Sequence, residues 1–119
     1  MSEDRPVSST RGFRVHFYEQ EGALIAECHG RLIYENAPHL KDEVRAKIPG
    51  NKHIILDLLD VPQVDSSGLG TVVGLYVSGR TRGCRVELAN ASQQIRELLS
   101  MTNLLSLFEA AGRHHGKTI

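Results

Sequence analysis

The sequence lacks an excess of charge of either sign. Its 119 residues include 14 Lys and Arg and 14 Asp and Glu, so the formal net charge is zero. Nucleic-acid grooves and polybasic membrane surfaces both need an excess of Lys and Arg. The zero net charge therefore argues against a nucleic-acid or membrane partner, although it does not exclude a locally basic patch.

Long apolar runs are also missing. The longest largely apolar stretches, such as residues 54–59, are far shorter than the roughly 20 residues that span a bilayer. Residues 1–12 are polar and contain no apolar stretch of the signal-peptide type. We therefore expect a protein of the cytoplasm.

Cysteine is scarce. Cys28 and Cys84 are too few for a disulfide scaffold and form no metal-binding spacing. In a reducing cytoplasm they are expected to be unpaired thiols inside the core. His114 and His115 are the one pair that suggests a metal, but two exposed histidines fall short of a ligand set, so no metal and no cofactor is expected.

The length favours one domain, because a second core would have too little chain around it. Residues 1–12 are expected to form a flexible arm, residues 13–111 the domain and residues 112–119 a polar tail. Hydrophobic periodicity and turn residues predict the elements inside the domain. In chain order these are strands 13–17 and 24–28, a helix over 37–48 with Asn36 as its cap, strand 53–59, a helix over 66–82, strand 85–89, a helix capped by Ser92, and an apolar closing segment over 104–111.

The order ββαβαβα indicates an α/β fold with a mixed sheet of four to five strands. A sheet covered on both faces should consist of nearly continuous apolar strands. Here Asp57, Arg85 and Glu87 interrupt the apolar pattern on one side of their strands. We therefore expect the helices to lie mainly on one face of the sheet and the other face to be partly exposed.

One loop concentrates the polar chemistry. Residues 61–70, with the letters VPQVDSSGLG, join a buried strand to the next helix. Ligand and partner sites of α/β sheets collect at such carboxyl ends of strands. Ser66 and Ser67 stand at a helix N-terminus, where free N–H groups and the helix dipole favour an anion. The same residues, with Asp65, are also the preferred helix caps, and the residue types alone do not separate the two interpretations.

The known catalytic motifs do not fit this loop. A nucleophile elbow needs a Gly two residues before its Ser, and Val64 and Asp65 stand there instead. A phosphate-binding loop needs a Lys after its second Gly, and a dinucleotide fingerprint needs a third Gly where Val73 is found. His53 begins the strand whose other end leads to the serines, so it should be too distant to act as a base. We therefore expect no enzymatic activity.

The helix after this loop is unusually rich in glycine. Gly68, Gly70, Gly74 and Gly79 each lower helix propensity by up to roughly 1 kcal/mol. Close approach of the helix to the sheet, or of a partner backbone to the helix, would explain why they are tolerated.

At this loop the chain resembles a known family. Residues 56–58, 61–62 and 64–70 are similar to the core signature of STAS domains, and more narrowly to bacterial anti-sigma factor antagonists. The resemblance extends over residues 13–108. Its second part is residues 95–104, which are similar to the last core helix of that family and the turn after it.

The resemblance implies a switch protein without catalysis of its own. In that family the unphosphorylated antagonist binds an anti-sigma factor, typically a serine kinase of the histidine-kinase-like ATPase fold, and so frees a sigma factor. The kinase phosphorylates the serine directly after the Asp, here Ser66 ahead of its neighbour Ser67, and a PP2C-type phosphatase resets it. The chain departs from the family at Ile33, where an Asp is often found, so a carboxylate is missing near the expected interface. The expected partner-binding residues are Tyr34, Asp65, Ser66, Ser67, Gly68 and Leu69.

Two other interpretations remain open. A non-switching STAS subunit of a lipid-transport ATPase complex, or of a stressosome-like scaffold, would use the serines only as helix caps. The presence of both hydroxyls favours the switch. A hydrolase or a nucleotide-binding enzyme is the third class, and turnover assays or a nucleotide titration would separate it from the others.

Overall fold

The computed structural model describes residues 8–10 and 12–104 of the chain. The apolar segment over residues 105–111, the tail and the pair of histidines in it lie outside the described residues. The elements are β1 (Ser8–Thr10), β2 (Phe13–Gln20), β3 (Ala23–His29), α1 (Ala37–Arg45), β4 (His53–Asp60), α2 (Ser66–Thr81), β5 (Arg85–Ala89) and α3 (Gln93–Met101).

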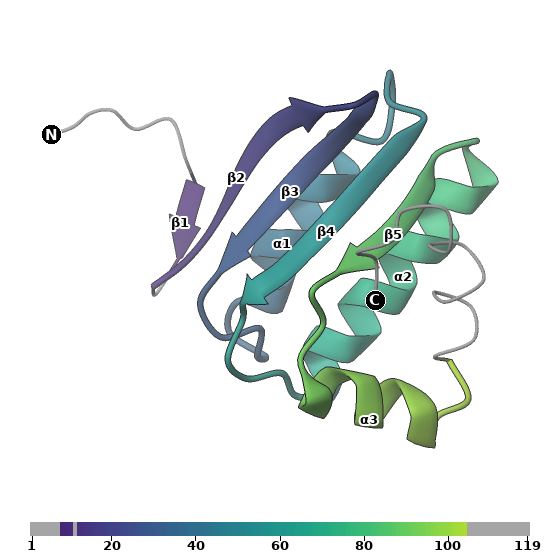
Figure 1. Ribbon diagram of the computed structural model, residues 1–119. Helices are drawn as coiled ribbons and strands as arrows, with labels where there is room; N and C mark the ends of the chain where they lie inside the picture. Colours follow the sequence, from purple (N-terminus) through teal and green to yellow (C-terminus); the bar gives the residue numbers. More distant parts are fainter. Residues whose placement is uncertain (1–7, 11, 105–119) are drawn as a thin grey trace, which may run out of the picture.

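The strands form one mixed sheet in the order β1-β2-β3-β4-β5 (Figure 1). The β1–β2 and β2–β3 pairs are antiparallel, whereas β3–β4 and β4–β5 are parallel. This arrangement confirms the predicted α/β fold with its mixed sheet. The short strand β1 differs from the expectation of a flexible arm over residues 1–12, because Ser8–Thr10 pair with residues 13–15 of β2.

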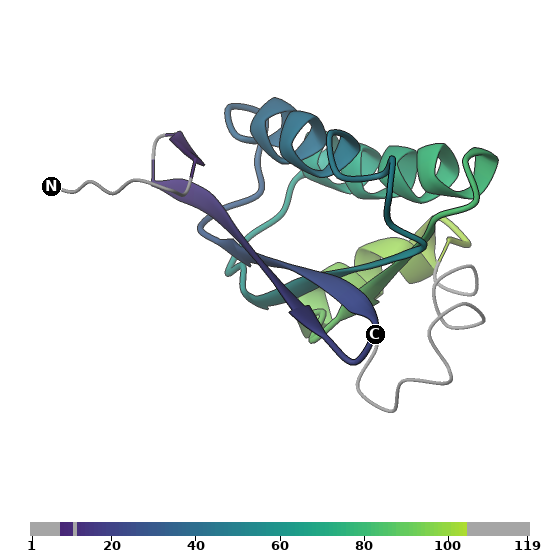
Figure 2. The same ribbon diagram turned by 90° about the horizontal axis from the view of Figure 1, so that it is seen from above.

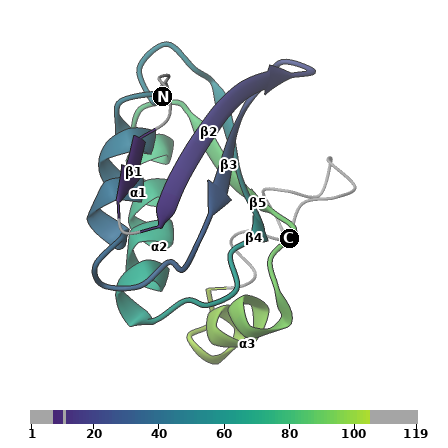
Figure 3. The ribbon, with the colours of Figure 1, turned by 90° about the vertical axis from the view of Figure 1, so that its left-hand side faces the viewer.

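Helices α1 and α2 lie side by side on one face of the sheet (Figure 2). Each connects two parallel strands, and each turns an apolar side toward the sheet: α1 buries Ala37, Leu40 and Val44. Helix α3 lies beyond the carboxyl ends of the parallel strands (Figure 3) and adds Ile95 and Leu99 to the same core. The prediction that helices cover mainly one face is confirmed.

Two of the glycines in α2 explain how closely this helix packs. A Cβ atom at Gly79 would lie 2.5 Å from the carbonyl oxygen of Cys84 and 2.6 Å from Cγ2 of Val86. A Cβ atom at Gly68 would overlap the carbonyl oxygen of Leu32. The predicted close approach of the helix to the rest of the domain is therefore confirmed at these two positions.

Both cysteines are unpaired and buried, as predicted. Burial raises the pKa of the Cys28 thiol to about 12, and burial also raises the pKa of Cys84. Since the thiolate is the reactive form of cysteine, both side chains act as small core residues.

The prediction that Glu87 faces solvent is wrong. Arg85 is exposed, but Glu87 is fully buried. Nε2 of His53 lies 2.8 Å from one oxygen of the Glu87 carboxylate, and Nε of Arg85 lies 3.2 Å from the other. A buried carboxylate is tolerated only when it is paired, and two basic side chains on adjacent strands meet that requirement.

The start of α1 also differs from the prediction. Asn36 occupies the N-cap position, but its side chain does not cap the helix. Its Nδ2 instead donates a hydrogen bond of 2.8 Å to the carbonyl oxygen of Arg31. Asn36 is buried, and this hydrogen bond supplies a partner to a carbonyl group of the preceding loop. The helix ends at Arg45 rather than 48, yet Ile48 is still buried.

Candidate functional site

The candidate site is built where the loops after β3 and β4 meet, at the carboxyl ends of these strands. The backbone N–H of Gly30 donates to the carbonyl oxygen of Asp60 at 3.1 Å. Further along, the N–H of Leu32 donates to Gln63, and the N–H of Asp65 donates to Leu32. These bonds join the segment before α1 to the segment before α2, so the two loops form one unit.

Asp65 is the residue that completes this unit. It is the N-cap of α2, and its Oδ1 accepts a hydrogen bond of 2.9 Å from the backbone N–H of Gly68. Its Oδ2 accepts a second bond of 2.9 Å from the backbone N–H of Tyr34, which lies in the other loop. These N–H groups, first that of Gly68, lower the pKa of the Asp65 carboxyl. The carboxylate therefore caps the helix and ties both loops together.

Replacing Asp65 with Ala is expected to lower the free energy of unfolding by about 1 kcal/mol at neutral pH, the usual value of an N-cap. The folded-state pKa of Asp65 is lowered, so its contribution is complete above the ordinary aspartate pKa of about 3.9 and is lost as the pH falls through the folded-state pKa. Urea unfolding at neutral pH and at about pH 3 should show that the difference between wild type and Asp65→Ala shrinks in acid.

Ser92 provides a matched control without a titratable group. Its Oγ caps α3 by accepting a hydrogen bond of 3.2 Å from the backbone N–H of Ile95. Ser92→Ala should therefore lose a similar free energy at both pH values. If Asp65→Ala and Ser92→Ala show the same pH dependence, the charge of Asp65 does not stabilise the loops.

The two serines differ in their exposure to solvent. Ser66, the first residue of α2, is exposed, and its hydroxyl makes no hydrogen bond within the part of the chain that the structure describes. Ser67 is half-buried. The expectation of free N–H groups for an anion holds only in part, because the Asp65 carboxylate already accepts the backbone N–H of Gly68. The chain's own carboxylate thus occupies one of the donors at the helix N-terminus.

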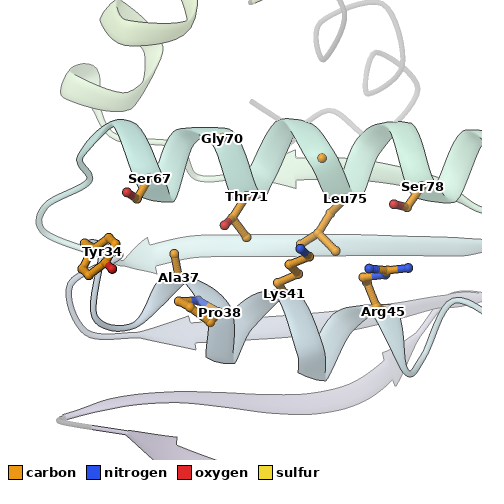
Figure 4. A pocket seen from close by; sticks show the side chains of 11 residues that line it. Tyr34, Ala37, Pro38, Lys41, Arg45, Ser67, Gly70, Thr71, Leu75 and Ser78 are labelled. Carbon is orange, nitrogen blue, oxygen red and sulfur yellow. The ribbon is translucent and has the colours of Figure 1, made fainter.

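The other residues expected to bind a partner fall into two groups. Tyr34 is 76% exposed and lies beside the start of α2 (Figure 4). Gly68 and Leu69 belong to the buried side of α2, where Gly68 contacts the loop at Leu32. The accessible part of the site thus consists of Tyr34, Ser66 and Ser67. The buried residues Gly68 and Leu69 pack the start of α2 against the domain.

A groove between α1 and α2, which we call the α1–α2 groove, begins at Tyr34 and Ser67 (Figure 4). Its volume is about 560 Å³. The groove could not be predicted from the sequence, where the glycines of the helix were the only related signal. Helix α1 contributes Ala37, Pro38, Lys41 and Arg45 to its lining, and α2 contributes Gly70, Thr71, Gly74, Leu75 and Ser78.

Other kinds of site find no support in the described residues. His53 begins β4, whereas the serines follow the other end of that strand, and its Nε2 contacts Glu87. Within residues 8–10 and 12–104, no group of three or more His, Cys, Asp and Glu side chains is arranged to hold a metal ion. Among the helices that the structure describes, none is both long and apolar enough to cross a membrane.

Comparisons with known proteins agree with this architecture. The STAS domain family matches residues 14–117 of the chain. The anti-sigma-B factor antagonist of Bacillus subtilis is 24% identical over 98 residues, which are 82% of this chain and 90% of that protein.

Two solved structures extend the comparison. The crystal structure of TM1081 from Thermotoga maritima matches with a TM-score of 0.70 and 28% identity, over 76% of this chain and 79% of that one. The Bacillus cell fate determinant SpoIIAA, solved in its phosphorylated form, has the same fold, with a TM-score of 0.65 and 19% identity over 81% of this chain and 86% of that one. The chain therefore belongs to the STAS domain family, and within that family it resembles the anti-sigma factor antagonists.

Proposed function

We propose that this chain is an anti-sigma factor antagonist whose binding is switched by phosphorylation of Ser66. Without the phosphoryl group it binds an anti-sigma factor and so frees a sigma factor. The anti-sigma factor is a serine kinase of the histidine-kinase-like ATPase fold, and a PP2C-type phosphatase restores the free hydroxyl. The chain itself acts in the cytoplasm as a binding module and catalyses no reaction.

The observation that carries the proposal is the exposed hydroxyl of Ser66 directly after a fixed carboxylate. A kinase can reach this hydroxyl without unfolding the domain, because Ser66 begins α2 at the surface. The bonds of Asp65 to Gly68 and Tyr34 hold the surrounding backbone in one conformation. The name of the Bacillus subtilis relative and the phosphorylated form of SpoIIAA support the same interpretation.

The geometry also supports an effect on the partner rather than on the fold. A phosphoryl group adds about −1.5 to −2 charges at neutral pH. At Ser66 this charge would lie next to the Asp65 carboxylate, which already occupies the N–H groups of Gly68 and Tyr34. Those two N–H groups are therefore not available to the phosphate, and the dianion on exposed Ser66 faces whatever contacts that residue.

Mass spectrometry of the full chain, purified from its own cells, tests the acceptor. We expect a population with one phosphoryl group on Ser66, produced by a kinase from the same cells and removed by a PP2C-type phosphatase. Ser66→Ala should abolish the modification. Ser67→Ala is the matched control, since it removes the neighbouring hydroxyl, and it should be modified like the wild type.

Two results would contradict the proposal. The first is a phosphoryl group on Ser67 that persists in Ser66→Ala. The second is an unmodified Ser66 under conditions in which the chain is bound to an ATP-dependent serine kinase of its own cells.

A further inference from the structure

We propose that the α1–α2 groove binds an acidic segment of the anti-sigma factor, alongside the contact at Ser66. This inference rests on the proposed function and names the surface and charge through which the partner is recognised. Three observations carry it: the open backbone of α2, the unpaired cations of α1, and the position of the groove next to the serines.

The backbone of α2 is open toward the α1–α2 groove. A Cβ atom at Gly70 or Gly74 would meet nothing within 4 Å. Unlike Gly68 and Gly79, these two glycines are not needed for packing inside the described part of the domain. They still weaken the helix, since Gly is less favourable than Ala by about 1 kcal/mol in a helix interior. A segment of another protein that lies close to the helix backbone accounts for them.

The charge of the α1–α2 groove has one sign. Lys41 and Arg45 stand four residues apart on α1 and both line the groove, with the Lys41 side chain pointing toward α2 (Figure 4). Within residues 12–104, neither side chain has an ion-pair partner. None of the residues that line the groove is acidic, and α2 contains no Asp or Glu. Because the whole chain is neutral, this local excess of positive charge selects an acidic ligand.

The groove is continuous with the candidate phosphorylation site. Its end is lined by Tyr34 and Ser67, and Ser67 is the chain neighbour of Ser66. A partner that contacts Ser66 can therefore reach Lys41 and Arg45 along the groove. A phosphoryl group on Ser66 would place negative charge beside the incoming acidic segment, and like-charge repulsion would then help to release it.

Photo-cross-linking in the cells of origin tests the inference. The full chain carries benzoylphenylalanine in place of Ser78, which lines the groove and leaves the two bare glycines unchanged. After irradiation, the cross-linked peptide is identified by mass spectrometry. We expect a peptide of the anti-sigma factor in which Asp and Glu outnumber Lys and Arg.

Charge reversal measures how much the two cations contribute to the cross-linking yield. Lys41→Glu combined with Arg45→Glu should lower the cross-linking yield by about tenfold or more. The matched control is Lys52→Glu combined with Arg82→Glu, because these two cations are also exposed but do not line the groove. This control should leave the cross-linking yield within about twofold of the wild type. Thermal melting checks that both double variants are folded.

The outcomes separate this inference from the proposed function. If Ser66→Asp abolishes the cross-link but reversal at Lys41 and Arg45 leaves it unchanged, the switch stands and the groove inference is wrong. If the reversal abolishes the cross-link but the captured protein neither phosphorylates Ser66 nor responds to Ser66→Asp, the groove recognises an acidic segment of some other protein and the proposed function is wrong. A cross-linked peptide that is basic, or no cross-link at all, overturns the inference.

Discussion

Ser66→Asp is expected to weaken binding of the anti-sigma factor by about a thousandfold. A partner surface that fits around a small neutral hydroxyl would have to desolvate a carboxylate, which costs several kcal/mol when no cation meets it. A loss of about 4 kcal/mol corresponds to roughly a thousandfold in affinity. Titration calorimetry of the purified partner with wild type, Ser66→Asp and Ser66→Ala measures the effect, and Ser66→Ala should bind like the wild type.

The fold should be almost unaffected by the same change. Ser66 is exposed and its hydroxyl has no hydrogen-bond partner within the described residues, so neither substitution removes an interaction seen there. The added charge at Ser66→Asp is repelled by Asp65 and attracted by the helix dipole, each by about 0.3–1 kcal/mol at an exposed site. We expect melting temperatures close to the wild type. The switch mechanism is refuted if Ser66→Asp binds the anti-sigma factor as tightly as the wild type, or if this variant is unfolded.

Gly68→Ala is expected to destabilise the domain by about 3 kcal/mol or to prevent folding. The new methyl group would overlap the carbonyl oxygen of Leu32 and would lie 2.8 Å from its Cγ and 2.9 Å from Cγ2 of Val64. The Leu32 carbonyl cannot move freely, because it accepts the N–H of Asp65. Overpacking against fixed backbone costs about 1–3 kcal/mol and occasionally more. Urea unfolding of the purified variant gives the value.

Gly70→Ala is the matched control on the same helix, two residues further along. A Cβ atom there meets nothing within 4 Å, so only helix propensity changes. Ala should stabilise the protein by up to about 1 kcal/mol. Gly68→Ala should therefore lower the free energy of unfolding, whereas Gly70→Ala should raise it. Equal changes in the two variants would mean that α2 packs against Leu32 more loosely than the structure shows.

The local elements could be predicted from the sequence because short-range chemistry decides them. Strand β5 has the bounds that its apolar pattern indicates, and Asp65 and Ser92 cap their helices because their side chains reach N–H groups three residues ahead. The order of strands and helices then indicated the mixed sheet, and the polar residues Asp57 and Arg85 in its strands indicated helices on one face. The resemblance to the STAS family rests on short motifs within residues 56–70 and 95–104, and the family matches residues 14–117.

Tertiary structure alone decided how distant groups meet. The burial of Glu87 depends on His53, which is 34 residues away in the chain and comes from an adjacent strand. The second hydrogen bond of Asp65 comes from Tyr34, 31 residues away, across two loops. The α1–α2 groove likewise exists only because the two helices lie side by side on one face of the sheet (Figure 2), so that cations of α1 and glycines of α2 line the same groove. Periodicity shows which side of an element is apolar, but a paired charge or a groove depends on the partner that the fold brings to that side.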